Sequence, residues 1–195
     1  MAAKSKVTEK AKRRSPISRA EGEQRLVSAA RELIKTKPFS EVGVRDIAEL
    51  ADVNHGFVHT WFGSKNDLLL AVVREMAMDA AKKAAEAEPG QMALDVTDPE
   101  LQLFIRLVLW LNLEGVNTRK ALPELPIVNA LEKRYVEIEG MRPDVAHIAA
   151  IQTASIGIGG ATFAPLITAD DNIDLPQVMG LLRHIIGLLA KYPPA

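Results

Sequence analysis

The sequence contains no cysteine among its 195 residues. This absence excludes a disulfide framework, a thiolate zinc site and a cysteine nucleophile. Aromatic residues make up only 5% of the chain, whereas hydrophobic residues make up 48%. Alanine and leucine dominate this apolar set, so the composition favours a helical protein.

Long apolar runs are also missing. No run approaches the roughly 20 residues that are needed to cross a bilayer. The first 20 residues lack the apolar core of a secretory signal. We therefore expect a cytoplasmic protein that does not associate with membranes.

The net charge of −1 hides an uneven distribution of charge. Residues 1–65 carry 13 lysine and arginine residues and eight acidic residues, a net charge of +5, whereas residues 66–195 carry a net charge of −6. A basic N-terminal third on an acidic remainder indicates an N-terminal unit that binds a polyanion. For residues 1–16 alone, we favour a solubilising tail over a segment that binds a polyanion.

Apolar periodicity and capping signals predict an all-α fold of about nine helices. Ser18 and Glu21 have the spacing of a capping box, which begins a helix that runs to about Lys37. Asn54 is the expected N-cap of a short helix. Eight of these helices can be given bounds: the first, and seven more at about 44–51, 54–62, 64–87, 99–118, 127–139, 143–164 and 175–191.

The helices at 44–51 and 54–62, joined by a tight turn, form a helix-turn-helix. Val58, Trp61 and Phe62 are expected to fasten the second helix to the core. The side chains left to point outward on that helix are Asn54, His55, Phe57, His59 and Thr60. Such short to medium side chains, which hydrogen-bond or make apolar contacts, suit a helix in the major groove of DNA.

The segment "VRDIAELADVNHGFVHTWFGSKNDLLLAVV", residues 44–73, resembles the DNA-binding segment of TetR-family transcriptional regulators. The shared features are the "RDIAE" helix, Gly56, the aromatic pair Trp61-Phe62 and the "SK" that opens the next helix. The resemblance covers roughly residues 20–70. It implies a homodimer with an N-terminal three-helix DNA-binding domain and a C-terminal helical domain for ligand binding and dimerisation. By resemblance, the expected DNA-binding residues are Arg45, Asn54, His55, Gly56, Phe57, His59, Thr60 and Lys65.

Three positions depart from the family pattern. Asp52 stands where glycine is usual in the turn, and aspartate tolerates a left-handed backbone better than most residues. Gly43 stands where a capping threonine is frequent, and His59 stands where tyrosine is common.

His55 and His59 have the spacing of two metal ligands, but no third ligand lies nearby, so we expect no metal and no cofactor.

Small residues form a stripe along the helix at 143–164, and bulky residues form a stripe along the last helix. These stripes pack either within one chain or between two chains, and the resemblance favours a four-helix dimer interface. The expected interface residues are Ala146, Ala150, Gly157, Gly160, Ala164, Leu175, Val178, Leu182, Ile185 and Leu189.

A ligand pocket is expected among the helices at 64–87, 99–118, 127–139 and 143–164. The richness in aliphatic residues indicates that the pocket is apolar. Polar or aromatic groups embedded in these helices are the candidate ligand contacts, namely Trp110, Asn112, Glu114, Tyr135, His147 and Gln152.

These observations predict a ligand-responsive transcriptional regulator, a repressor that a small, largely apolar effector releases from a palindromic operator. The expected divisions are a basic flexible arm at 1–17, a helix-turn-helix DNA-binding domain at 18–66, and a ligand-binding and dimerisation domain at 67–195. The alternative is a helical ligand-binding or scaffold protein that does not bind DNA. We expect no enzyme, because no catalytic constellation with a recognisable spacing is present.

Overall fold

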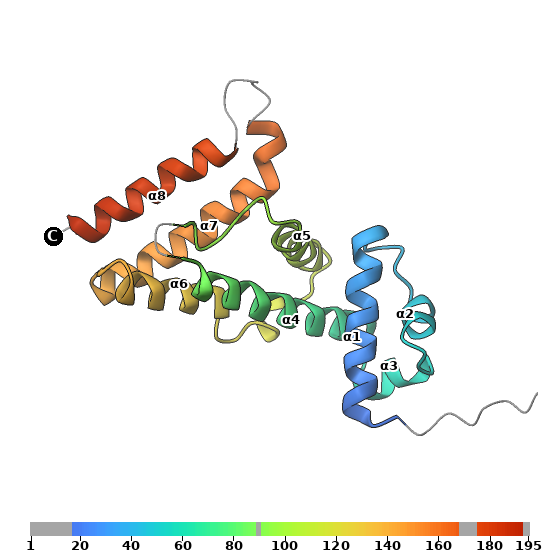
Figure 1. The fold of residues 1–195 in the computed structure, drawn as a ribbon. Coiled ribbons are helices and arrows are strands. Elements are labelled where there is room, and N and C mark those ends of the chain that lie inside the picture. Colours follow the sequence, from blue (N-terminus) through green and yellow to red (C-terminus); the bar gives the residue numbers. More distant parts are fainter. Residues whose placement is uncertain (1–16, 89–90, 168–174, 193–195) are drawn as a thin grey trace, which may run out of the picture.

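The computed structural model describes residues 17–88, 91–167 and 175–192, and these residues form helices without any strand (Figure 1). The predicted all-α fold is therefore confirmed. The described part contains eight α-helices and one 3-10 helix: α1 (Arg19–Thr36), α2 (Val44–Leu50), α3 (Gly56–Trp61), α4 (Lys65–Glu86), α5 (Pro99–Leu113), η1 (Thr118–Lys120), α6 (Pro126–Glu137), α7 (Pro143–Ile167) and α8 (Leu175–Lys191).

Local signals in the sequence account for the first helix boundaries. The Ser18 hydroxyl caps α1 by accepting a hydrogen bond from the Glu21 amide at 3.2 Å. Helix α2 begins after Gly43 without a side-chain cap, as glycine at this position predicts. Asp52 adopts φ +54° in the turn between α2 and α3, which confirms the expected left-handed backbone.

The expected N-cap of α3 was wrong by one residue. Helix α3 begins at Gly56, and His55 takes the N-cap position without a side-chain cap. The Asn54 Oδ1 instead accepts a hydrogen bond from the Gly56 amide at 2.8 Å. Asn54 thus forms a local turn that delays the start of the helix.

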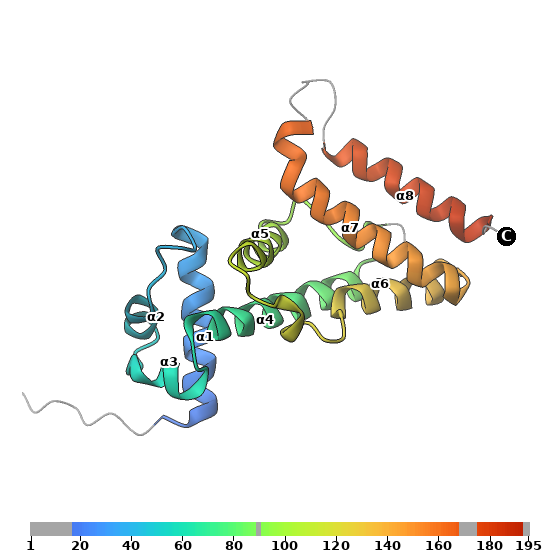
Figure 2. The same ribbon diagram turned by 180° about the vertical axis from the view of Figure 1, so that it is seen from behind.

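The N-terminal unit and the helical body share α4. Leu26, Ile47 and Val58 of α1, α2 and α3 are fully buried together with Leu68 near the start of α4. Helix α4 then runs out of this unit and into the body (Figures 1 and 2). A movement of α4 would therefore displace both the N-terminal unit and the helical body.

Helix α5 lies between α1 and α7 in both views (Figures 1 and 2). It ends at Leu113 rather than near residue 118, because Gly115 adopts φ +77° and turns the chain. Helix α6 packs beside α4 and α7, and α8 lies along α7 at the end of the molecule farthest from α1–α3. Among the described helices, none is long and apolar enough to cross a bilayer.

Candidate nucleic-acid interface

Helix α3 presents one face to the core and the other to solvent. Val58 is fully buried, whereas 42% of Phe57 is exposed. Asn54, His55, His59 and Thr60 are exposed as well. The expected outward orientation of these side chains is confirmed, while their contacts with DNA remain a prediction.

Local hydrogen bonds fix the polar side chains of α3. The Thr60 hydroxyl donates to the Gly56 carbonyl at 3.1 Å, which turns the rest of the side chain outward. The His59 Nδ1 lies 3.3 Å from the Gly63 carbonyl oxygen. Because a carbonyl oxygen only accepts, this contact is a hydrogen bond when Nδ1 carries the proton, and neutral His59 then offers Nε2 as an acceptor.

An aromatic stack holds Phe57 in place. The Phe57 and Trp61 rings lie 4.3 Å apart between centroids and are nearly parallel, with an interplanar angle of 2°. Trp61 packs in turn against Gly22 of α1, where an added Cβ would come within 2.4 Å of the indole. This stack was not predicted from the sequence, although the spacing of four residues places the two aromatics on one side of a helix.

Lys65 and Arg45 differ in their hydrogen-bond partners. The Lys65 ammonium donates to the Val42 carbonyl at 2.8 Å and to the Phe39 carbonyl at 3.3 Å. It therefore fastens the loop between α1 and α2 and does not extend into solvent. Arg45 is exposed and makes no hydrogen bond or ion pair with another described residue.

The net positive charge of the N-terminal third comes from its first 16 residues. Residues 17–65 contain seven basic and seven acidic residues, so their net charge is zero. Several of these basic side chains are paired, for example Lys37 with Asp46 at 2.9 Å and Arg19 with Glu23 at 2.6 Å. Within the described part of the chain, no group of three or more acidic or histidine side chains is arranged to hold a metal ion.

Known sequences match this region and most of the chain. The sequence profile of the family described as "Bacterial regulatory proteins, tetR family" matches residues 26–72, from the middle of α1 into α4. The HTH-type transcriptional repressor Rv3405c of Mycobacterium tuberculosis is 27% identical over 167 residues, which cover 84% of each chain. The HTH-type transcriptional regulator Mb3439c of Mycobacterium bovis matches to the same extent.

These matches support a TetR-family transcriptional regulator, and the matched relatives are regulators and not enzymes. Regulators of the TetR family bind DNA operators and act as dimers with small-molecule effectors.

Solved structures agree on the TetR-family fold. The TetR family repressor AlkX from Dietzia sp. strain DQ12-45-1b, implicated in biodegradation of n-alkanes, superposes with a TM-score of 0.59 at 18% identity, covering 87% of this chain and 96% of that chain. A TetR transcriptional regulator from Legionella pneumophila superposes with a TM-score of 0.50 at 19% identity, covering 90% of this chain and 97% of that one.

The body of this TetR-family protein contains an apolar cavity of about 240 Å³ between α4, α5, α6 and α7. Its lining is made of hydrophobic side chains and glycine, and no charged or hydrogen-bonding side chain contributes to it. Helix α5 supplies much of the wall through Leu101, Phe104, Ile105 and Val108, and Ala77 of α4 and Ile158 of α7 complete it.

None of the six residues expected to contact a ligand lines this cavity. Asn112, Glu114, His147 and Gln152 are exposed, and His147 pairs with Glu132 at 2.7 Å. Tyr135 lines a different cavity of about 460 Å³ between α6, α7 and α8. There its hydroxyl bonds to that of Thr153 at 2.8 Å, and burial raises the pKa of Tyr135.

Trp110 lies at the contact between the body and the DNA-binding unit. Its ring centroid is 5.7 Å from that of Phe39, and the Lys65 ammonium lies 5.7 Å from the Trp110 ring centroid. Nothing in the local sequence relates Trp110 to Phe39, since the contact joins α5 to the loop between α1 and α2.

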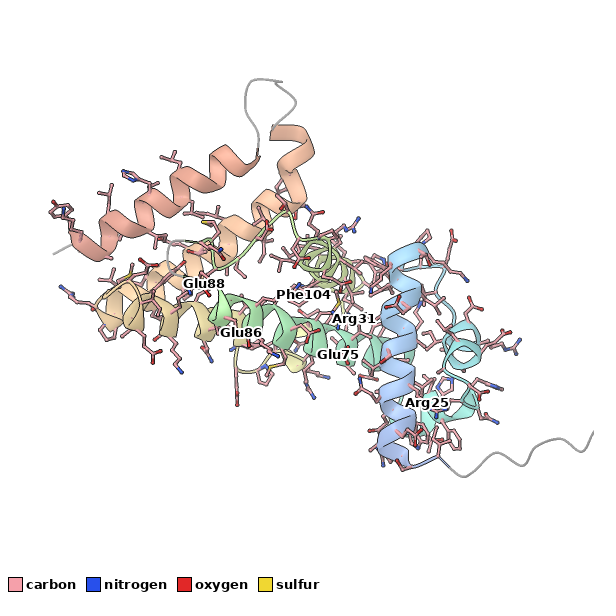
Figure 3. All side chains as sticks on the ribbon, viewed as in Figure 1. Arg25, Arg31, Glu75, Glu86, Glu88 and Phe104 are labelled. Atoms are coloured by element: carbon pink, nitrogen blue, oxygen red, sulfur yellow. The ribbon has the colours of Figure 1, made fainter. Side chains whose placement is uncertain are left out.

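Ion pairs join the N-terminal end of α5 to α1. Arg31 donates to Glu75 at 2.9 Å, to Asp79 at 2.6 Å and to Glu100 at 2.8 Å. Lys35 also pairs with Glu100, at 3.0 Å. Figure 3 shows Arg31 and Glu75 beside each other where α1 meets α4, with Phe104 on the neighbouring α5. We call Arg31, Lys35, Glu75, Asp79 and Glu100 the junction cluster.

The expected dimer stripe on α7 is wrong in its direction. Ala146 and Ala150 are fully buried within the chain, and Gly157 is buried near Val96. Small residues lie on this side because α7 crosses the rest of its own chain closely. The side chains of Ala164, Leu175 and Val178 lie outside the described residues, and Gly160 is half-buried.

Larger aliphatic residues are exposed on α7 and α8, among polar residues such as His147 and Gln152. Ile148 and Ile151 are exposed on α7, and Leu181, Ile185 and Leu188 are exposed on α8. Of the expected α8 stripe, Leu182 is buried and Leu189 is half-buried, so Ile185 is the described member that faces solvent.

Proposed function

We propose that this TetR-family regulator is a repressor that a small, largely apolar effector releases from a palindromic operator. Residues 18–66 would form the DNA-binding domain, with residues 1–17 as a basic arm. Residues 67–195 would bind the effector and form the dimer. The name of the mycobacterial repressor, at 27% identity, supports repression over activation.

The position of α5 is the observation that carries this proposal. One side of α5 lines the apolar cavity, and its two ends contact the DNA-binding unit through Glu100 and Trp110. A molecule that fills the cavity therefore presses on a helix that is attached to α1 and to the loop between α1 and α2. Because packed interfaces switch between discrete arrangements, a small shift of α5 changes the position of the recognition helix.

The lining of the cavity defines the chemistry of the effector. A charged or strongly polar molecule would lose its hydration there without gaining a hydrogen bond, which costs several kcal/mol. A neutral aliphatic or aromatic molecule gains from burial in proportion to its apolar area. We therefore place the effector in this cavity and not in the larger cavity beside Tyr135, which Arg134, Glu139 and His184 also line.

The dimer would form through the exposed aliphatic face of α7 and α8, which includes Ile148, Ile151, Leu181, Ile185 and Leu188. Several large aliphatic residues exposed on two neighbouring helices are typical of a protein interface. A two-fold axis through this face would place the two α3 helices roughly 34–36 Å apart, or further on a longer operator, so that they enter successive major grooves.

A paired titration tests the proposal. DNA binding is measured first, by mobility shift on the DNA upstream of the protein's own coding sequence. A panel of neutral aliphatic and aromatic compounds is then titrated with and without that DNA. By linkage, an effector that lowers DNA affinity must itself bind more weakly in the presence of DNA by the same factor, ordinarily about 5- to 150-fold.

Each failure of this test has a distinct meaning. Equal compound affinities with and without DNA would contradict release by an effector. Binding of compounds without any binding of DNA would favour the alternative, a helical ligand-binding protein that does not bind DNA.

A further inference from the structure

Helix α3 lacks the side chains that read guanine most strongly. Arginine and lysine recognise guanine O6 and N7, and asparagine and glutamine recognise adenine N6 and N7. Residues 54–61 contain no arginine, lysine or glutamine. Their one asparagine, Asn54, already uses Oδ1 to accept from the Gly56 amide.

Besides the exposed imidazoles of His55 and His59, α3 presents one large apolar group. Phe57 is 42% exposed, and one face of its ring stacks on the parallel Trp61 ring. The Thr60 hydroxyl proton is used by the Gly56 carbonyl. In the major groove, the apolar feature that marks one base alone is the 5-methyl group of thymine.

We propose that Phe57 is the specificity-determining residue of α3 and that it reads thymine methyl groups in the operator half-site. This inference rests on the proposed DNA-binding function and adds the chemistry by which the site is recognised. The pattern of thymines in the major groove then contributes to the selection of the half-site.

The aromatic stack gives Phe57 the rigidity that this role needs. A ring without support would lose rotamer freedom on binding, which weakens the contact. Here the Trp61 ring lies 4.3 Å from Phe57 and is itself held against Gly22 of α1. Gly22 is therefore a positioning residue, because a methyl group in its place would come within 2.4 Å of Trp61 and displace both rings.

Deoxyuridine substitution tests the proposal without changing the hydrogen-bonding pattern of the base. The probe is a DNA duplex selected from a random library by the full-length protein. Each thymine of the half-site is replaced in turn by deoxyuridine, which removes only the 5-methyl group. We expect one or two positions at which the wild-type protein binds about fourfold more weakly per lost methyl group.

The variant Phe57→Ala, measured on the thymine and deoxyuridine duplexes beside the wild type, completes a double-mutant cycle between the side chain and the methyl group. It should bind the thymine duplex more weakly than the wild type and bind the thymine and deoxyuridine duplexes equally. Met78→Ala, which removes an exposed apolar side chain of α4, is the matched control and should keep the fourfold difference. An equal deoxyuridine penalty in Phe57→Ala and wild type would overturn the proposal.

Gly22→Ala separates positioning from general damage to the fold. It should abolish the preference for thymine over deoxyuridine while the helical circular dichroism signal and the salt-dependent binding to unrelated DNA are retained. Ser28→Ala, on the exposed side of α1, should leave the preference unchanged.

The outcome also separates this inference from the proposed function. Wild-type binding that is insensitive to deoxyuridine at every thymine would overturn the role of Phe57 and leave DNA binding intact. Failure to select any duplex would contradict DNA binding and with it this inference.

Discussion

At the scale of single residues, the DNA-binding unit shows that a motif position does not by itself assign a role. Lys65 matches the family pattern, yet its ammonium donates to the carbonyls of Phe39 and Val42. Arg45 is exposed, with no partner among the described residues. We therefore predict that Lys65 contributes to stability and that Arg45 contributes to DNA binding.

A matched pair of variants distinguishes these two roles. Lys65→Ala removes charged hydrogen bonds that hold the loop between α1 and α2, so it should lower the free energy of unfolding by about 1.5–3 kcal/mol. Arg45→Ala should leave that free energy unchanged and reduce the slope of log affinity against log salt by about one per subunit. Urea denaturation and titrations at several salt concentrations measure the two effects. Unchanged stability in Lys65→Ala would show that its hydrogen bonds do not hold the loop.

At the scale of helices, the junction cluster joins α1, α4 and α5. Burial raises the pKa of Glu100, but hydrogen bonds from Arg31 and Lys35 outweigh burial and hold the pKa below its ordinary value. The folded protein therefore prefers the charged form of Glu100. The resulting stabilisation is present above the pKa of the unfolded chain and is lost as the pH falls through the lower pKa of the folded protein.

The junction cluster should consequently make the protein sensitive to acid. Between about pH 5 and pH 3, the thermal midpoint of the wild type should fall more steeply than that of Glu100→Gln. At pH 7, Glu100→Gln should be the less stable protein, because Arg31 and Lys35 lose a charged partner. Glu124→Gln changes an exposed glutamate for which no ion pair is recorded within the described residues, and it should follow the wild type. Parallel curves for wild type and Glu100→Gln would contradict the role of the cluster.

At the scale of the whole molecule, the two faces of α7 have separate tasks. The face with Ala146, Ala150 and Gly157 packs within the chain, and the face with Ile148 and Ile151 is exposed. Leu181 and Leu188 are exposed on α8, which packs beside α7. The oligomeric state should therefore depend on the aliphatic residues and not on the glycine.

Two variants on opposite faces of α7 test this division. Ile151→Asp places a charge in the proposed interface, where burial without a partner is costly, and should give a monomer by light scattering. Gly157→Leu should remain a dimer, because its side chain points towards Val96 and the cavity. It should lose effector binding and about 1–3 kcal/mol of stability through overpacking. A monomeric Gly157→Leu and a dimeric Ile151→Asp would restore the small-residue stripe as the interface.

The charge distribution of the whole chain makes a further prediction. Since residues 17–65 have no net charge, the excess positive charge of the N-terminal third belongs to residues 1–16. Deleting residues 1–16 should weaken binding to all DNA sequences by a similar factor and flatten the salt dependence. Affinity measured on selected and unrelated duplexes between 50 and 200 mM salt tests this. An unchanged affinity would show that these residues only aid solubility.

The sequence by itself determined the features that depend on near neighbours. The cap at Ser18, the left-handed turn at Asp52 and the outward face of α3 all follow from residues within about one turn of each other. Apolar periodicity was sufficient for the helices because each short segment carries its own signal. The family pattern over residues 26–72 has the same local character.

The tertiary structure alone decided which faces meet. Helix α7 has apolar residues around most of its surface, so spacing could not say whether its small or its large residues face the core. Arg31 bonds to Glu75 and Glu100 at separations of 44 and 69 residues, and Trp110 of α5 contacts Phe39 in the loop between α1 and α2. Such contacts depend on how the helices pack against one another after they have formed. Side-chain volume and helix crossing geometry select these partners, and sequence spacing does not.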